Sequence, residues 1–234
     1  VYINGERACF RPYGYTNFYV VCNRYLSYGA QNLIRVIARN ADQPNSRWYS
    51  GAGIYRPVTM YIGEKKRIEL NGVKIRTLSI HPATVEVFIK ATGDGNVSIE
   101  IEKNGKVVAT STGELVGGCA RMLVTIDDAK LWTIDTPELY DCRVKYEDDE
   151  QIETFGIRTI SCDATHGLCI NGKREIIRGA CIHSDNGILG ARSYPEAEER
   201  KVKLLKENGY NAIRSAHNPC AKSLLDACDR LGMM

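Results

Sequence analysis

Apolar and polar residues alternate along much of the first two thirds of the chain. The segments 84–91 (TVEVFIKA), 96–102 (NVSIEIE) and 139–146 (LYDCRVKY) show the period of two that is typical of strands with one buried face. The run 121–126 (RMLVTI) indicates a short buried strand, and 151–160 (QIETFGIRTI) continues the series. This spacing predicts an antiparallel sandwich of about 90 residues, the size of an immunoglobulin-like module.

Three Asn-Gly pairs, at 4–5, 104–105 and 171–172, lie between apolar, β-branched runs. Both residue types tolerate a positive φ, and the resulting type I′ turn has a twist that matches the flanking strands. The three pairs therefore predict hairpins, and no helix is expected before about residue 160.

After about residue 162 the pattern changes to alternating strands and helices. A hairpin over 168–177 leads into a strand over 176–183, and a helix then opens on Pro195, with glutamates in its first turns, and ends at Gly209. A strand over 211–215 follows. A second helix is indicated by apolar residues at helical spacing: Leu224, Leu225, Cys228 and Leu231. Two parallel strands joined by a helix predict a right-handed βαβ unit of a (β/α)8 barrel or an open sheet.

Composition narrows the function classes. The 234 residues include 31 basic and 28 acidic side chains, for a net charge of +3, so no strong field draws the protein to nucleic acid or an anionic membrane. No stretch approaches the roughly 20 apolar residues of a spanning helix. The basic run 65–67 lies beside Gly63 and Glu64 and indicates a solvated linker. We therefore expect a neutral partner.

Nine cysteines, an odd number, are scattered along the chain without a C-x-x-C pair. This arrangement matches neither a disulfide framework nor a zinc site. We therefore expect reduced thiols and a cytoplasmic location.

Polar side chains gather where the two parallel strands end. His183 and Asp185 follow the first strand, and Arg214, His217 and Asn218 close the second. In parallel α/β folds the carboxyl ends of strands carry functional residues, and neighbouring strands lie about 5 Å apart. The two groups are therefore expected to converge on one pocket.

The residues alone leave three interpretations of this pocket open. The histidines can be ordinary rim residues, with Arg214 pairing with a carboxylate inside the fold. His183, Asp185 and His217 can instead hold a metal ion, because imidazole and carboxylate suit zinc, iron or manganese. Neutral donors and acceptors around an apolar floor also suit the hydroxyl groups of a sugar.

Stretches along the whole chain resemble glycoside hydrolase family 2, which includes β-galactosidases and β-glucuronidases. Residues 1–62 resemble the later part of its jelly-roll sugar-binding domain, in VYINGERACFRPYGYTNFYV, NLIRVIARN and SRWYSGAGIYRPVTMYI. Residues 63–161 resemble its immunoglobulin-like β-sandwich, in LWTIDTPELYDCRVKY and FGIRTI. Residues 162–234 resemble the start of its catalytic barrel, in INGKREIIRGACIHSDNGILGA and NAIRSAHNPCAKSLLDACDRLGM.

The resemblance implies a mostly β chain with an α/β part: a partial jelly-roll sandwich, an immunoglobulin-like β-sandwich and the first two βα units of a (β/α)8 barrel. It implies that His183, Asp185, His217 and Asn218 bind the sugar. Arg214 is implied to orient a catalytic carboxylate and to lower its pKa. The expected substrate is a β-galactoside, and a homo-oligomer is left open.

The family hydrolyses with retention by two glutamates roughly 5 Å apart, and no acidic residue here matches either one. Both are expected beyond Met234, so we expect an internal piece of a longer enzyme that is inactive alone. Magnesium or sodium is implied only for the full enzyme. The alternatives are a β-glucuronidase, a non-catalytic glycan-binding sandwich module and the metal-dependent hydrolase.

Other residues receive narrower expectations. Tyr13 lies in a loop where some β-galactosidases supply an acidic residue, which bears on the choice of sugar. Five further residues are expected to pack rather than to bind: Trp48, Tyr49, Arg56, Trp132 and Arg158. Open sheet edges predict association or disorder over 1–62 and 163–234.

Overall fold

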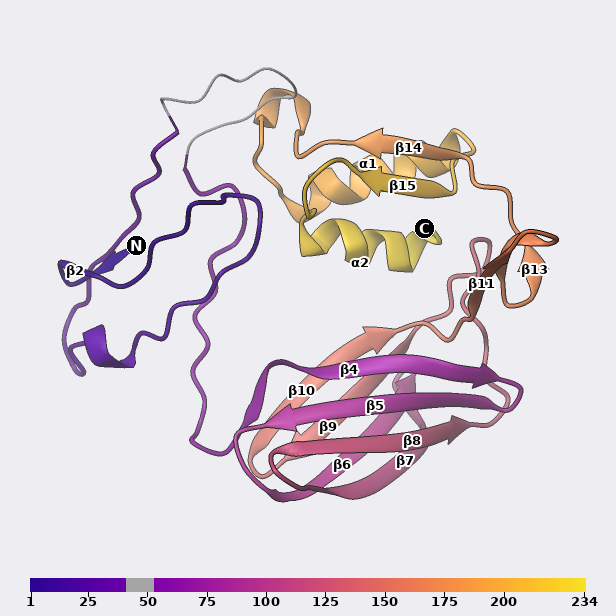
Figure 1. Ribbon diagram of the computed structural model, residues 1–234, viewed down its shortest axis with the longest axis horizontal. Helices are drawn as coiled ribbons and strands as arrows, with labels where there is room; N and C mark the ends of the chain where they lie inside the picture. The colour runs from indigo at the N-terminus through magenta and orange to yellow at the C-terminus, as the bar shows by residue number, and fades with distance from the viewer. Residues whose placement is uncertain (41–52) are drawn as a thin grey trace.

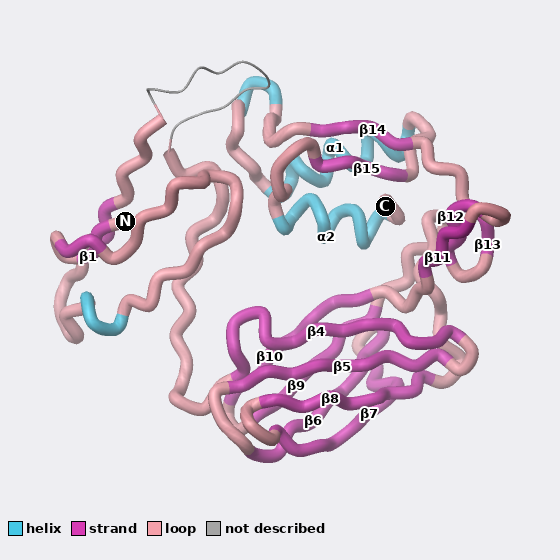
Figure 2. The backbone as a smooth tube through the Cα atoms, in the orientation of Figure 1, coloured by secondary structure: helices cyan, strands magenta, loops and turns pink. Residues whose placement is uncertain are grey.

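The computed structural model of the chain describes residues 1–40 and 53–234. Three parts can be followed in Figure 1: an N-terminal segment, a β-sandwich and an α/β unit that ends at the C-terminus. Strands far outnumber helices, as Figure 2 shows by colour. Within the described residues, no helix is long and apolar enough to cross a membrane.

The β-sandwich consists of two antiparallel sheets, in the orders β4-β5-β8 and β10-β9-β6-β7. Its strands are β4 (Ile68–Ile80), β5 (Ala83–Ala91), β6 (Gly95–Lys103), β7 (Lys106–Leu115), β8 (Cys119–Ile126), β9 (Tyr140–Tyr146) and β10 (Asp149–Phe155). Both inner faces contribute fully buried side chains, among them Val87, Ile89, Ile99 and Val144. The alternating pattern therefore builds one core between two sheets.

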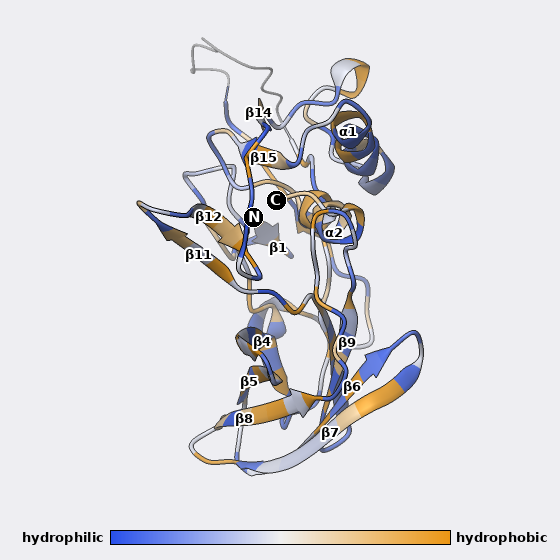
Figure 3. Cartoon of the chain, turned by 90° about the vertical axis from the view of Figure 1, so that its right-hand side faces the viewer, coloured by the Kyte–Doolittle hydropathy of each residue, from blue (hydrophilic) through white to orange (hydrophobic). Residues whose placement is uncertain are grey.

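Two expectations about the sandwich strands were wrong in detail. The run 121–126 is buried on one face only, because Leu123 on β8 is 63% exposed while Met122 and Val124 are buried; Figure 3 shows this strand in apolar colours. The run 151–160 is not one strand. It breaks after β10 at Gly156, where an added Cβ would lie 2.8 Å from the Cβ of Trp132.

The N-terminal segment has little regular structure. Its sheet, in the order β2-β1-β3, is formed by β1 (Tyr2–Ile3), β2 (Glu6–Arg7) and β3 (Ile34–Arg35). A short 3-10 helix, η1, spans Asn23–Tyr25. The turn at 4–5 has the predicted positive φ angles, +50° and +88°. The φ angles in the turns at 104–105 and 171–172 are also positive.

The α/β unit has the predicted order of strands and helices. A hairpin sheet of β11 (Ile160–Asp163), β12 (Gly167–Ile170) and β13 (Lys173–Arg174) comes first. The remaining elements are β14 (Gly179–Ile182), η2 (Gly187–Leu189), α1 (Pro195–Glu207), β15 (Ala212–Ser215) and α2 (Lys222–Leu231). β14 and β15 pair in parallel, from Gly179 opposite Ala212 to Ile182 opposite Ser215.

The first parallel strand begins three residues later than expected. The side chain of Asn211, which is 3% exposed, donates to the carbonyl of Ile176 at 2.9 Å and accepts from the backbone N–H of Arg178 at 2.8 Å. These bonds take the place of strand pairing, so regular structure starts only at Gly179. Both helices pack on one another over Val202, Leu224 and Ala227.

The sandwich and the α/β unit meet at Trp132. Its side chain is 1% exposed, its Nε1 donates to the carbonyl of Asp229 at 2.8 Å, and the guanidinium of Arg158 lies 4.2 Å from the indole centroid. Lys206 adds bonds from its ammonium group to the carbonyls of Ile134, at 2.7 Å, and Gly232, at 2.8 Å. The packing role predicted for Trp132 and Arg158 is confirmed.

Candidate functional site

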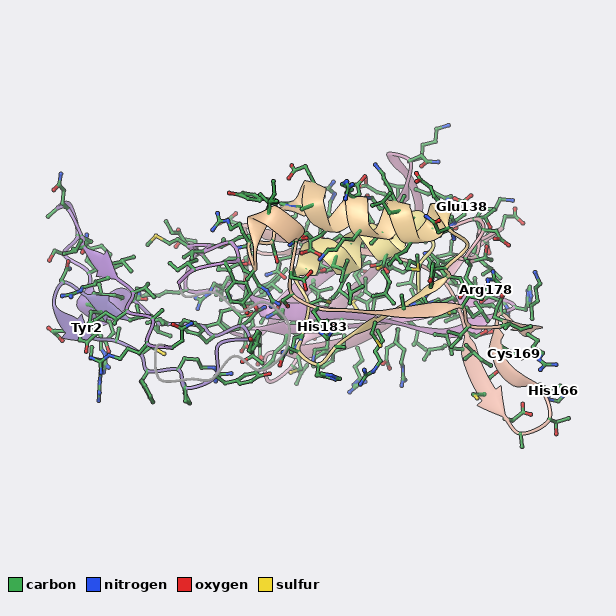
Figure 4. The ribbon with its side chains drawn as sticks, turned by 90° about the horizontal axis from the view of Figure 1, so that it is seen from above. Tyr2, Glu138, His166, Cys169, Arg178 and His183 are labelled. Carbon is green, nitrogen blue, oxygen red and sulfur yellow. The ribbon has the colours of Figure 1, made fainter. Side chains whose placement is uncertain are left out.

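The parallel pairing of β14 and β15 brings the two predicted groups of polar residues together. His183 follows β14 directly and is labelled in Figure 4. Its Nδ1 lies 2.6 Å from the carbonyl oxygen of Ala216, just beyond β15, and the rings of His183 and His217 are 6.1 Å apart between centroids. The two imidazoles therefore lie on one edge of the sheet, as the sequence predicted.

Hydrogen bonding fixes how each imidazole can act. A carbonyl oxygen only accepts, so Nδ1 of His183 carries the proton that it donates to the carbonyl of Ala216. A guanidinium only donates, so the Nδ1 of His217, 3.4 Å from Nη2 of Arg214, is the acceptor. The Nδ1 of His183 thus donates a hydrogen bond, whereas the Nδ1 of His217 accepts one.

Arg214 is the cation of the site. It lies opposite Cys181 in the β14–β15 register, and its Nη1 donates to the Cys181 sulfur at 3.7 Å. Its side chain is exposed, and the ion pairs formed among the described residues do not include it. The guanidinium is therefore available to a carboxylate.

The turn after β15 is held from two sides. The hydroxyl of Ser215 donates to the carbonyl of Asn218 at 2.6 Å. From the N-terminal segment, the hydroxyl of Tyr13 donates to Oδ1 of Asn218, and Nη2 of Arg56 donates to the carbonyl of Pro219 at 2.6 Å. Arg56 thus bonds the N-terminal segment to this turn. Its packing role stays a prediction, and Trp48 and Tyr49 lie outside the described residues.

Three tyrosines gather beside this turn, an arrangement that was not predicted from the sequence. The rings of Tyr13 and Tyr15 lie 5.6 Å apart, those of Tyr15 and Tyr55 lie 6.4 Å apart, and Arg56 covers Tyr55 at 5.1 Å. Burial raises the pKa of the Tyr55 phenol, although Arg56 opposes the rise. The only available signal was the aromatic content of 13–15, and partners about 40 residues apart cannot be paired from sequence.

Two parts of the chain match family descriptions. Residues 67–158 match "Glycosyl hydrolases family 2", and residues 164–234 match "Glycosyl hydrolases family 2, TIM barrel domain". The chain belongs to glycosyl hydrolase family 2. The fold class is confirmed with it: the chain contains the β-sandwich of family 2 and the start of its barrel.

Relatives in family 2 carry two kinds of name. The β-galactosidase BoGH2A of Bacteroides ovatus is 37% identical over 253 residues, which cover 100% of this chain and 30% of that protein. A β-glucuronidase of Bacteroides fragilis is 26% identical over 262 residues, covering 100% of this chain and 38% of that protein. The crystal structure of a family 2 member from Bacteroides cellulosilyticus has a TM-score of 0.90 at 35% identity, covering 100% of this chain and 35% of that one. The chain spans well under half the length of these relatives.

Asp185 does not join the histidines in a metal site. Its backbone carbonyl accepts from Nζ of Lys201 at 3.2 Å, and among the described residues no group of three His, Cys, Asp or Glu side chains is arranged to hold a metal ion. The Nδ1 of His183 is already bonded to a carbonyl. The donor set of the described residues therefore does not support the metal-dependent alternative.

All nine cysteines are free thiols. Burial raises the pKa of Cys142 and of Cys228 to about 12. Thiols of such high pKa are poor nucleophiles and poor metal ligands at neutral pH, so these two cysteines act as small core residues.

Proposed function

We propose that this chain is the sugar-binding and supporting part of a retaining glycosidase that hydrolyses terminal β-galactosides. The observation that supports this most directly is the pairing of His183 with His217 beside Arg214 at the ends of two parallel strands. Sugar hydroxyls need directional donors and acceptors without strong charge, and imidazole side chains can supply both.

Each residue has a proposed role. His183, Asp185 and His217 bind the terminal sugar, and Asn218 closes the turn that borders it. Arg214 orients the carboxylate nucleophile and keeps it ionised, since a cation lowers the pKa of a neighbouring carboxyl. The described ion pairs leave Arg214 out, which agrees with a partner from another part of a longer enzyme.

The two catalytic carboxylates are proposed to lie outside this chain. Retention requires two carboxyl groups roughly 5 Å apart across the glycosidic bond. Asp226 and Asp229 are carried by α2 rather than by a strand end, and Asp226 pairs with Lys222 at 2.8 Å. We expect the 234-residue chain alone to show no turnover of a nitrophenyl β-galactoside, and measurable turnover by a pure sample would contradict this.

A galactoside is favoured over a glucuronide by charge. A glucuronide carries a carboxylate, which enzymes usually hold with cationic side chains. The strand ends here offer Asp185, whose negative charge repels a carboxylate, while Arg214 is assigned to the nucleophile. The relatives carry both names and do not decide between the two sugars. The preference for a galactoside therefore rests on the charges at the strand ends.

The test is a comparison of substrates in the full-length enzyme that contains this chain. We expect kcat/KM for nitrophenyl β-galactoside to exceed that for nitrophenyl β-glucuronide at least about 100-fold, the loss typical of leaving a charged group unpaired in a site. A preference for the glucuronide would overturn the choice of sugar. A lack of activity on both would overturn the glycosidase proposal.

A further inference from the structure

The loop between β14 and α1, residues 183–194, is bonded to an ion pair of α1 whose carboxylate is buried. Glu198 is 2% exposed, and its Oε2 lies 2.8 Å from Nζ of Lys201 one turn along α1. Its other carboxylate oxygen accepts from Nδ2 of Asn186 at 3.2 Å. The ammonium of Lys201 also donates to the carbonyl of Asp185 at 3.2 Å. Both members of the pair therefore bond directly to the loop.

Asn186 links the two ends of this loop. Its Nδ2 donates to the carbonyl of Arg192 at 2.9 Å as well as to Glu198, and its backbone N–H donates to the carbonyl of Gly190 at 2.8 Å. The carboxylate of Glu198 thus lies at the centre of a network that closes the loop on itself. Asp185 and His183 are the residues that immediately precede this closure.

The pair lies next to the sugar-facing edge. A cavity of about 10 Å³, close to the volume of a single water probe, is lined by Glu198 and Lys201 together with His183 and Ser215. The ion pair and the imidazole thus border the same small cavity. The bond from Lys201 to the carbonyl of Asp185 also reaches the chain two residues from His183.

The residue directly after Glu198 on the same helix provides a contrast. Glu199 pairs with Lys203 at 2.6 Å, but these side chains are 32% and 54% exposed, against 3% and 21% for Glu198 and Lys201. An exposed pair contributes little because water competes with it. A buried charge left without its partner forces its surroundings to rearrange. Helix α1 thus holds two pairs of the same chemistry, of which one contacts the loop.

We propose that Glu198 and Lys201 are positioning residues of the glycosidase. Their ion pair fixes the loop of residues 183–194, and through it His183 and Asp185 keep the orientation that binds the terminal sugar. This inference rests on the proposed function of that site. Neither side chain touches the sugar, and their effect is on how well the sugar is bound.

The test uses two matched pairs of variants in the full-length enzyme. Lys201→Met and Glu198→Gln are expected to raise KM for nitrophenyl β-galactoside about 10-fold while kcat changes less than about 2-fold, the signature of lost binding that ground and transition states share. Lys203→Met and Glu199→Gln are the controls and are expected to leave KM within about 2-fold. Lys201→Arg, which keeps the charge, is expected to restore most of the affinity.

The readouts separate positioning from folding. A role in stability alone changes the amount of active enzyme and leaves the KM of the folded fraction unchanged, so equal KM values in Lys201→Met and Lys203→Met would overturn the proposal. If Lys201→Met does not fold, Glu198→Gln decides, because it keeps the shape of the side chain. His183→Ala tests the underlying site: an unchanged KM there overturns the proposed function, whereas a raised KM there with a normal KM in Glu198→Gln overturns only the positioning role.

Discussion

Trp132 shows how one residue joins two parts of the molecule. Its indole is buried between the sandwich and α2, is bonded to the carbonyl of Asp229 and is stacked against Arg158. Burial lowers the pKa of Arg158, and the charge of Asp229 opposes this shift. The side chain of Trp132 therefore both fills the contact between the two parts and forms a hydrogen bond across it.

Trp132→Ala is expected to lower the free energy of unfolding by about 3–5 kcal/mol, because it empties a buried site and leaves Arg158 uncovered. Urea unfolding followed by circular dichroism measures this. Leu123→Ala on β8 removes an apolar side chain that is 63% exposed and is expected to change stability by less than about 0.5 kcal/mol. A similar decrease in unfolding free energy in the two variants would contradict the role of Trp132 at the contact between the sandwich and the α/β unit.

Single residues also show where sequence reasoning works and where it stops. His183 and Arg214 could be found because polar residues at the carboxyl end of a short apolar strand have few structural uses. Glu198 could not, since an acid in the first turn of a helix is expected to be solvated and to interact with the helix dipole. Its burial depends on the 183–194 loop folding back over α1, which is a tertiary effect.

At the scale of elements, the C-terminal end of α2 is fitted against the sandwich. Gly232 follows the helix with φ +70°, and a Cβ added there would lie 2.1 Å from the carbonyl oxygen of Ile134. Gly209 follows α1 with φ +80° and has nothing within 4 Å of an added Cβ. The two glycines thus share a backbone conformation and differ in their surroundings.

Gly209→Ala is expected to cost about 1–2 kcal/mol of unfolding free energy, the price of a left-handed alanine. Gly232→Ala is expected to cost clearly more, because the loop that carries Ile134 must move away from α2. Thermal unfolding of both variants measures the difference. Equal shifts in Tm would show that the loop yields freely and would contradict the close fit described here.

The contact between β10 and α2 has a predicted pH dependence. Burial raises the pKa of the Glu153 carboxyl above its usual 4.5; Lys222 opposes the rise and Asp226 adds to it. The folded state therefore keeps this proton at pH values where the unfolded chain has released it. The contribution of this group to stability is present below the unfolded pKa and is lost as pH rises through the folded pKa.

Glu153→Gln removes this loss because the amide does not ionise. The variant is expected to be more stable than the parent at pH 7 and to approach it as the pH falls below about 4. Urea unfolding at a series of pH values measures this, with Glu114→Gln on the exposed side of β7 as the matched control. A Glu153→Gln variant that is less stable at pH 7 would contradict the assignment.

Elements were predictable where the pattern was local. The hairpin turns and the helix ends follow from Asn-Gly pairs, Pro195 and Gly209. β4 was missed because it contains a further Asn-Gly pair, at 71–72, that makes no hairpin: Asn71 has φ +57°, and the strand shifts register between Ile68 and Val73. An added Cβ at Gly72 would lie 2.4 Å from the carbonyl oxygen of Lys90, so the glycine serves a close strand approach.

At the scale of the whole molecule, the sandwich is the part with its own closed core. The N-terminal segment instead exposes large apolar side chains, such as Val21 at 81% and Ile62 at 87%. Within the described residues, β14 and β15 form a sheet of only two strands. Exposed apolar surface and open edges favour association between chains.

The 234-residue chain is therefore expected to self-associate at micromolar concentration, whereas a fragment of residues 64–160 is expected to be a monomer. Light scattering coupled to size-exclusion chromatography measures both. A monodisperse monomer of the 234-residue chain would contradict this prediction. The same measurement bears on the homo-oligomer that the sequence analysis left open.

The central claim is that Arg214 supports a catalytic carboxylate beside the sugar-binding histidines. In the full-length enzyme, Arg214→Ala is expected to lower kcat for nitrophenyl β-galactoside at least about 100-fold, the scale of losing one preorganised charge at the reacting centre. The acid limb of the pH profile is expected to move to higher pH, because the nucleophile loses the cation that lowers its pKa. An unchanged kcat with an unmoved acid limb would contradict the claim.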